Sequence, residues 1–286
     1  MKRVANAHTS WYLVNVKARR EQTTDHYIRV FNALGVEDPL ISFPRGGKSG
    51  SLKYIKISND LDNLGYYKWM ELGVLSYTII NPEAFYNRRR REDVIIDNWN
   101  EDVVANKKEA IIYFIPSAHI LAVRCNSKIS LKNIVFYLSM ALNRIEPEGF
   151  DVDPIKQRDV LERILTAHAI THLHANISYS NPGHSDGFYE AFDSKLRDMG
   201  ASRVEIIASG SKDHPLNGED DGMLQSIVNL SEHNGYVQAT IQSTENGKLE
   251  KIDSNEHPRK MIISEIVNDI NTTIYNTIRQ IGRAHV

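Results

Sequence analysis

The feature that most constrains the fold of this chain is that its apolar residues recur at two different spacings, one typical of strands and one typical of helices. In residues 51–57 apolar and polar side chains alternate, which is typical of a half-buried β-strand. In residues 129–145 the apolar side chains recur at helical spacing, which indicates an amphipathic helix. Because both periods recur along the chain without a tandem repeat, we expect an α+β protein in which helices pack on small mixed or antiparallel sheets.

We expect two α/β sub-domains, separated at residues 146–149, where proline and glycine interrupt the pattern. The first, residues 1–146, reads as β-α-β-β-β-β-α, and its first helix is expected to end at Gly35. The second, residues 150–280, reads as α-β-α-β-α-β-β-α, with a hairpin at Asn246-Gly247. The expected strands are residues 11–18, 51–57, 72–80, 109–115, 119–125, 170–179, 203–208, 236–242 and 249–253.

A closing helix is expected over residues 262–278, where isoleucine and valine form an apolar stripe at helical spacing. The stripe consists of Ile263, Ile266, Val267, Ile270, Ile274 and Ile278. Such a stripe must be covered, either by the chain's own sheet or by a second copy in a homodimer, and we favour its own sheet.

The composition is that of an ordinary globular protein, with 41% hydrophobic and 8% aromatic residues. Cys125 is the single cysteine, so no internal disulfide and no cysteine metal cage can form. No run of about eighteen apolar residues occurs, and the start lacks the apolar core of a signal peptide. We therefore expect a cytoplasmic protein without membrane attachment. Residues 281–286 match one translation of a common sequencing adapter, so we expect an artefact there and infer nothing from them.

Charge is unevenly distributed along the chain. Residues 1–150 carry 21 Lys and Arg against 16 Asp and Glu, whereas residues 151–286 carry 13 against 20. An asymmetry of this kind is typical of a nucleic-acid-binding face on the basic half, but two halves that attract each other would show it too.

The candidate binding residues are a run of arginines and a basic loop. Residues 86–99 contain Arg88, Arg89, Arg90 and Arg91, with Phe85 and Tyr86 beside them, in a connection whose structure the pattern does not define. Arg45 and Lys48 lie in a glycine-rich loop, and Arg19 and Arg20 could join them. Guanidinium groups bind phosphates in bidentate fashion and aromatic rings stack on bases, so this set predicts nucleic-acid contact. A solvated surface is the alternative, because Glu92, Asp93 and Asp97 could neutralise the arginines.

The loop at residues 46–49, Gly-Gly-Lys-Ser, does not have the spacing of a phosphate-binding loop. Ser42 stands where that motif needs its first glycine, and a strand rather than a helix is expected to follow. We expect no nucleotide site here and no cofactor.

Histidines give no firm metal or catalytic motif. His168, His172 and His174 are close in sequence, but only His172 and His174 are expected to share a strand face, so we expect no zinc site. His8 begins a His-x-Ser-hydrophobic pattern like that of two-histidine phosphoesterases, but the second copy of that pattern is absent.

Several segments of the sequence, taken in order, resemble the corresponding segments of a bacterial protein family. They are the strand at 11–18, the loop at 46–52, the strand at 72–78, then 160–164, 173–178, Asn181-Pro182, 234–237 and the Asn246-Gly247 turn. In these segments the chain resembles domain-of-unknown-function family 4747, over nearly its whole length. That family has no established catalytic residues, so the resemblance implies no site.

The element order of the second half is also similar to that of Rex-type phage-exclusion proteins of lambda-like prophages. Those proteins are dimeric, bind DNA without sequence preference and are similar in fold to a bacterial recombination-associated DNA-binding protein. This analogy of layout implies a homodimer, DNA binding and a role in defence against phage.

Our first hypothesis is a non-enzymatic protein that binds DNA or RNA without sequence preference, using Arg45, Lys48 and Arg88–Arg91 as phosphate contacts. Two alternatives remain. A nucleic-acid or nucleotide hydrolase would need a cleft that gathers two or more of His168, His172, His174, Asp186 and His214. A protein-interaction module would need an exposed apolar patch.

Overall fold

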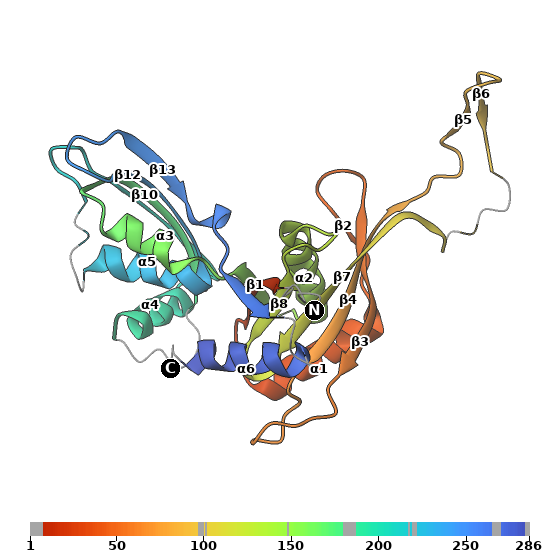
Figure 1. Cartoon of the computed structure of the whole chain (residues 1–286), viewed down its shortest axis with the longest axis horizontal. Helices are drawn as coiled ribbons and strands as arrows, with labels where there is room; N and C mark the ends of the chain where they lie inside the picture. The colour runs from red at the N-terminus through yellow and green to blue at the C-terminus, as the bar shows by residue number, and fades with distance from the viewer. Residues whose placement is uncertain are drawn as a thin grey trace, which may run out of the picture.

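Two antiparallel sheets organise the computed structural model, which describes residues 8–96, 100, 102–147, 149–179, 187–216, 218, 222–264 and 270–283. Figure 1 shows the two sheets as the cores of two lobes, with a small two-stranded hairpin standing apart from both. Helices pack on both large sheets, which confirms the expected α+β fold.

Within the described residues the first sheet has eight strands, and all the pairings are antiparallel. Its order is β14 (Lys260–Ser264), β1 (His8–Ala18), β8 (Ile120–Arg124), β7 (Val104–Ile115), β4 (Met70–Ile79), β3 (Ser49–Ile57) and β2 (Ile41–Ser42). Strand β9 (Phe150–Pro154) also pairs with β1. The strand β1 therefore pairs with two strands that follow residue 146 in the sequence.

Helices cover both faces of the first sheet. Helices α1 (Thr24–Glu37) and α2 (Leu131–Ile145) cover one face, where Phe31 of α1 stacks on Phe114 of β7 with ring centroids 4.1 Å apart. Helix α6 (Ile270–Arg283) covers the other face and buries Ile274 and Ile278 against residues that include Leu13. Successive side chains of β1 point to opposite faces, so one strand contributes to both cores.

The second sheet has the order β11 (Arg203–Ser209), β10 (Ala169–Ser178), β12 (Gly235–Gln242) and β13 (Leu249–Asp253). Helices α3 (Arg158–Leu165), α4 (Gly187–Asp198) and α5 (Met223–Asn234) lie on one of its faces, as Figure 1 shows. The opposite face carries polar side chains, His172, His174, Gln238 and Thr240 among them, because alternate residues of each strand point away from the helices. That face is not covered by a helix in the described part of the chain.

The small two-stranded hairpin is the end of a long arm between β4 and β7. Its strands are β5 (Phe85–Asn87) and β6 (Glu92–Val94), and Figure 1 shows it projecting well beyond the first sheet. Two short 3₁₀ helices complete the fold: η1 (Pro116–Ala118) leads into β8 and η2 (Ser254–Glu256) follows β13.

Helix α1 continues past Gly35, so the expected end at this glycine is wrong. Thr23 begins the helix by accepting a hydrogen bond from the His26 backbone, and Asp38 ends it in a left-handed conformation with φ of 36°. At Gly35 a Cβ atom would lie 3.1 Å from Ile55 Cδ1. The glycine therefore allows the helix to approach β3 closely instead of ending it.

The second half of the chain differs most from expectation. Strand β9 was not expected at all, and residues 260–264 form β14 where the closing helix was expected to begin. Both strands pair with β1, and α6 packs on the first sheet, so the expected division at 146–149 does not separate the two sheets in space. The apolar stripe is covered by the chain's own sheet through Ile263, Ile274 and Ile278, whereas Ile266 and Val267 lie outside the described residues.

We predict that Ile274→Ala lowers the free energy of unfolding by about 2–5 kcal/mol, because its side chain is fully buried between α6 and the first sheet. Ile262→Ala is the matched control, since Ile262 is 69% exposed on neighbouring β14 and should change stability by no more than about 0.5 kcal/mol. Urea unfolding monitored by circular dichroism measures both. Equal effects would show that α6 is not part of this core.

A second prediction concerns Gly235, at the direct junction of α5 and β12. A Cβ atom there would collide with the Asn176 carbonyl oxygen of β10, and the residue has φ of 151°. We expect Gly235→Ala to destabilise the protein by more than about 2 kcal/mol, since the strand pairing itself must shift. Gly187→Ala, at a position with open space for a methyl group, should be neutral or slightly stabilising, and urea unfolding measures both variants.

Candidate nucleic-acid interface

The arginine run forms the turn at the tip of the arm. Arg88–Arg91 connects β5 to β6, and the Asn87 side chain accepts backbone hydrogen bonds of 3.0 Å from both Arg89 and Arg90. The Asn87 carbonyl accepts a further bond of 2.7 Å from the Arg91 backbone, and Arg91 has φ of 59°. All four arginine side chains are exposed. Asn87 therefore fixes the backbone of the turn and leaves the four arginine side chains exposed to solvent.

Acidic neighbours offset the tip only weakly. The Arg90 guanidinium lies 3.6 Å from the Glu92 carboxylate, with the two side chains 76% and 55% exposed. An ion pair exposed to this extent contributes little and is screened by salt. Asp93 is also exposed, and Asp97 lies outside the described residues.

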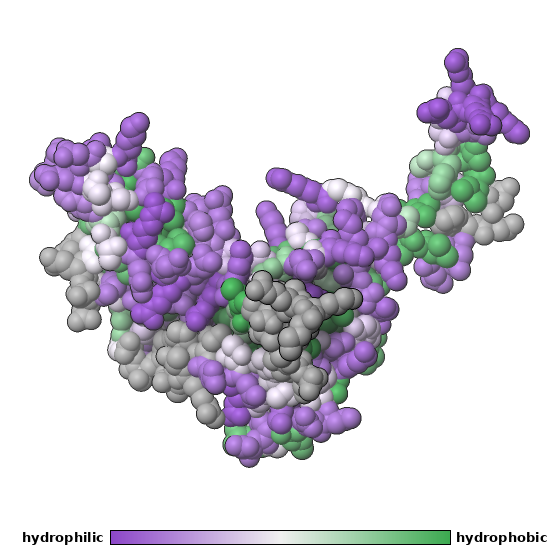
Figure 2. All heavy atoms as spheres, viewed as in Figure 1, coloured by the Kyte–Doolittle hydropathy of each residue, from purple (hydrophilic) through white to green (hydrophobic). Residues whose placement is uncertain are grey.

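Below the tip the arm carries exposed apolar side chains. Ile79, Tyr86, Ile95 and Val103 are all exposed, and Ile95 reaches 66%. Figure 2 shows this arrangement as a hydrophilic tip above hydrophobic spheres. A two-stranded hairpin without a sheet or helix to pack on is marginally stable in water. The arm is therefore a segment whose apolar residues are not used for folding the rest of the chain.

Arg45 and Lys48 lie at the base of the arm, not at its tip. They belong to the β2–β3 loop, and Ser49, which follows Lys48, pairs with Tyr77 near the end of β4. The arm begins just beyond that point. The structure thus brings the two expected basic groups to the same extension of the sheet, one at each end of the arm (Figure 1).

Two lysines that sequence reasoning missed join Arg45 and Lys48 at the base of the arm. Lys107 and Lys108 are exposed on β7, and Lys108 pairs with Ser76 of β4. The signal in the sequence that could have identified them is a pair of adjacent lysines near the start of a long strand. Arg19, in contrast, does not belong to this set, because its guanidinium pairs with the buried Asp151 carboxylate at 3.2 Å.

The histidines do not form a metal site in the described part of the chain. His172 and His174 line a hollow of about 400 Å³ on the open face of the second sheet. His172 Nδ1 lies 3.2 Å from Ser209 Oγ, whereas His174 Nε2 lies 3.9 Å from the Glu205 carboxylate, so the two rings engage different partners. His168 and His214 are exposed in other segments, and Asp186 lies outside the described residues. No group of three potential metal ligands occurs among the residues described.

A larger cleft of about 810 Å³ lies between the two sheets. Its floor is the edge of the first sheet, with Tyr12 of β1 and Lys260 of β14. One wall is the first two turns of α2, which contribute Leu131 and Val135. The other wall contains Tyr236 of β12 and the residues of η2. No sequence pattern predicted this cleft, because the residues that line it come from segments that are distant in the chain.

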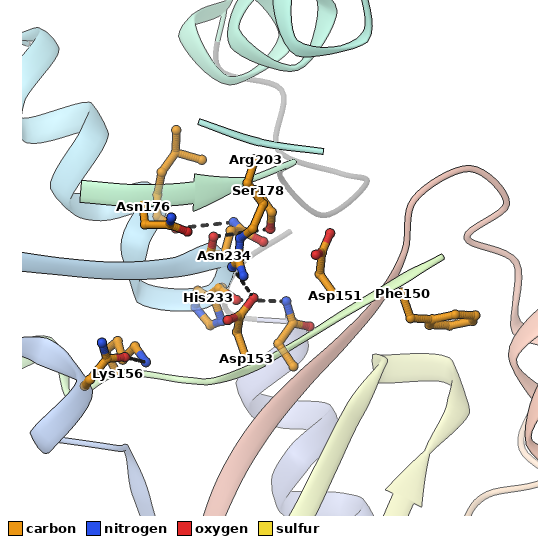
Figure 3. A network of polar contacts seen from close by, with 12 residues as sticks. Phe150, Asp151, Asp153, Lys156, Asn176, Ser178, Arg203, His233 and Asn234 are labelled. Carbon is orange, nitrogen blue, oxygen red and sulfur yellow. Dashed lines mark hydrogen bonds and ion pairs between the residues drawn. The ribbon is translucent and has the colours of Figure 1, made fainter. Parts of the chain in front are cut away.

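Figure 3 shows a network of polar residues where the two lobes meet, and two of its charged members, Asp153 and Arg203, also line the cleft. Arg203 of β11 donates to the Asp153 carboxylate of β9 at 2.7 Å, while Phe150 of β9 points away from the polar network. Burial raises the pKa of Asp153, and the Arg203 guanidinium opposes that rise. Lys156 donates to Asn255 Oδ1 at 2.8 Å, and burial lowers its pKa to about 8. Charged groups at this junction are therefore largely removed from water.

Lys17 is a further buried charged group at this junction. Its ammonium group is buried 5.6 Å from the centre of the Tyr179 ring, with no hydrogen-bond acceptor among the described residues. Burial lowers its pKa to about 7, although Asp193, Asp151 and Asp153 act in the opposite direction. An amine with a pKa near 7 is present in both its charged and its neutral form near neutral pH.

We predict that Lys17 makes stability depend on pH between about pH 7 and 10.5, the interval between its folded pKa and its ordinary value. In this range the unfolded lysine holds a proton that the folded one lacks, so unfolding takes up a proton and the free energy of unfolding rises with pH. Urea titrations of the wild type and Lys17→Met across this range should show the wild type gaining stability relative to the variant. Parallel curves would mean that the folded lysine keeps its ordinary pKa.

Comparison with known proteins identifies a family but no activity. A family model described as "Domain of unknown function (DUF4747)" matches residues 7–281. No match to the chain is found among curated proteins. Among the described residues, none of the helices combines the length and apolar character that crossing a membrane requires. The similarity to Rex-type proteins stays a prediction.

Proposed function

This chain belongs to the DUF4747 family, and we propose that it is a non-enzymatic protein that binds nucleic acid without sequence preference. The basic arm would contact the phosphate backbone. A homodimer and a role in defence against phage, which the layout of the second half implied, stay predictions.

The observation that carries the proposal is the placement of four exposed arginines on a single ordered turn, remote from the cores of both sheets. Arginine presents a planar fork of donors that matches a phosphate group, and a projecting hairpin can follow a backbone that a flat surface could not reach. Arg45, Lys48, Lys107 and Lys108 extend the basic surface to the base of the arm. Contacts of this type position a protein on nucleic acid and carry no sequence information.

A protein-interaction module is the second candidate, and the exposed apolar residues of the arm favour it. Ile79, Ile95 and Val103 would be shielded from water in a complex with another protein. The two candidates differ in their response to salt. Phosphate contacts weaken steeply as salt rises, whereas apolar burial does not.

We predict that the double reversal Arg88→Glu/Arg89→Glu lowers affinity for a labelled DNA duplex or RNA by at least about tenfold near physiological salt, since it replaces two phosphate donors with like charges. The slope of log affinity against log salt should also become shallower, by about 0.9 for each phosphate of duplex DNA that the variant no longer neutralises. Fluorescence anisotropy across a salt series measures both quantities.

Lys195→Glu/Lys212→Glu is the matched control for this experiment. It makes the same change in net charge at exposed residues of the other lobe. We expect it to keep most of the affinity and the full salt slope. An equal loss in both variants would show that overall charge, not the arm, determines binding, and unchanged affinity in the arginine variant would remove the proposed site.

A further inference from the structure

We propose that the cleft between the two sheets receives the base of an unpaired nucleotide. The inference rests on the proposed function and specifies it further: the preferred ligand is a nucleic acid with a single-stranded stretch. The site is separate from the arm, because none of the arm residues that the structure describes lines the cleft.

The shape and apolar surface of the cleft suit a flat aromatic ligand. Its volume of about 810 Å³ falls within the usual range for small-ligand sites, about 300–1,000 Å³. Tyr12 belongs to the floor and Tyr236 to the facing wall, and both rings are partly exposed. Leu131, Val135 and Pro258 add apolar surface. Proteins that bind single-stranded nucleic acid use aromatic side chains of this kind as stacking partners for bases.

The charges of the cleft distinguish its base-binding side from its phosphate-binding side. Lys260 lies with its ammonium group 5.7 Å from the centre of the Tyr12 ring, and Lys132 is exposed on the first turn of α2. Asp253 and Glu256 line the opposite wall. Carboxylates repel phosphates but accept hydrogen bonds from the amino groups of bases. A nucleotide would therefore enter with its base toward the acidic wall and its phosphate toward the lysines.

Polar groups near the floor add hydrogen-bonding capacity. Arg203 holds Asp153, yet its Nε atom is buried without an acceptor among the described residues. A buried donor that lacks a partner carries a free-energy cost, so a shift of the Arg203 side chain that brought Nε to an acceptor on the ligand would strengthen binding. Carbonyl oxygens and ring nitrogens of bases are acceptors of this type.

The cleft continues onto the open face of the second sheet. Asp253 and Glu256 line both the cleft and the hollow that contains His172 and His174. The His174 ring meets the Tyr236 ring edge to face, with centroids 6.0 Å apart. An uncovered antiparallel sheet with exposed rings and amide side chains can accommodate further splayed-out nucleotides. In a duplex the bases are stacked and paired, so they would have to leave the helix at a cost in free energy before entering.

The test compares Tyr236→Leu with Tyr67→Leu, a partly exposed tyrosine in the β3–β4 loop that does not line the cleft. Each variant is titrated with a single-stranded oligonucleotide and with a blunt duplex of the same sequence, at one salt concentration. We expect the wild type to prefer the single strand, and Tyr236→Leu to lose about 5- to 150-fold of that affinity, the range found when a stacking aromatic is removed. Tyr236→Phe should restore it, and thermal unfolding confirms that each variant is folded.

Photo-cross-linking separates failure of this inference from failure of the proposed function. An oligonucleotide with a photoreactive base should cross-link to peptides containing Tyr12 or Tyr236, as mapped by mass spectrometry. Equal affinity for single strand and duplex, with cross-links confined to residues 85–94, would overturn the cleft inference and leave the arm as the binding site. Absence of binding to any nucleic acid at low salt would overturn both.

Discussion

The pairing of β1 with strands from both halves of the chain is the constraint on which the rest of the structure depends. Leu13 marks the junction: its backbone N–H donates to the Arg259 carbonyl at 3.2 Å, and its carbonyl accepts from Ile155 at 2.9 Å. One residue thus joins the segment after β9 and the segment before β14 to the first sheet. Because the second sheet lies between these two segments in the sequence, both of its connections to the first sheet are fixed at the edge of β1. That double attachment places the wall containing Tyr236 opposite the floor containing Tyr12 and creates the cleft.

Local periodicity was sufficient to predict most strands and helices, and it failed where pairing over long distances determines the structure. Strand β9 contains Asp151 and Asp153 and ends at Pro154, a composition typical of a loop. Its aspartates are tolerated because Arg19 and Arg203 pair with them, and neither contact can be deduced from local sequence. At residues 260–264 the isoleucines continue a helical stripe into α6, so the period could not show that β14 pairs with β1.

The two parts of the candidate interface differ in how far the sequence reveals them. The arginine run is contiguous, so its chemistry was visible, but only the fold shows that Asn87 turns it into the tip of a projecting arm. Lys107 and Lys108 were overlooked because their nearness to Arg45 and Lys48 follows from the β3–β4–β7 register. The cleft combines residues from distant segments, which charge and hydropathy patterns do not connect. Sequence reasoning therefore finds contiguous sites and misses sites that tertiary pairing assembles.

The uneven charge of the chain acquires a physical meaning if nucleic acid binds as proposed. The basic first half would supply the long-range attraction through the arm, which depends on salt and not on sequence. In the cleft, Asp253 and Glu256 would direct the phosphate toward Lys132 and Lys260 on the opposite side, so that the base stacks on Tyr12 and Tyr236. A duplex would bind the cleft less well, because its bases are stacked and paired and would have to leave the helix before they could enter. The acidic half would thus select the strand state of a ligand that the basic half attracts.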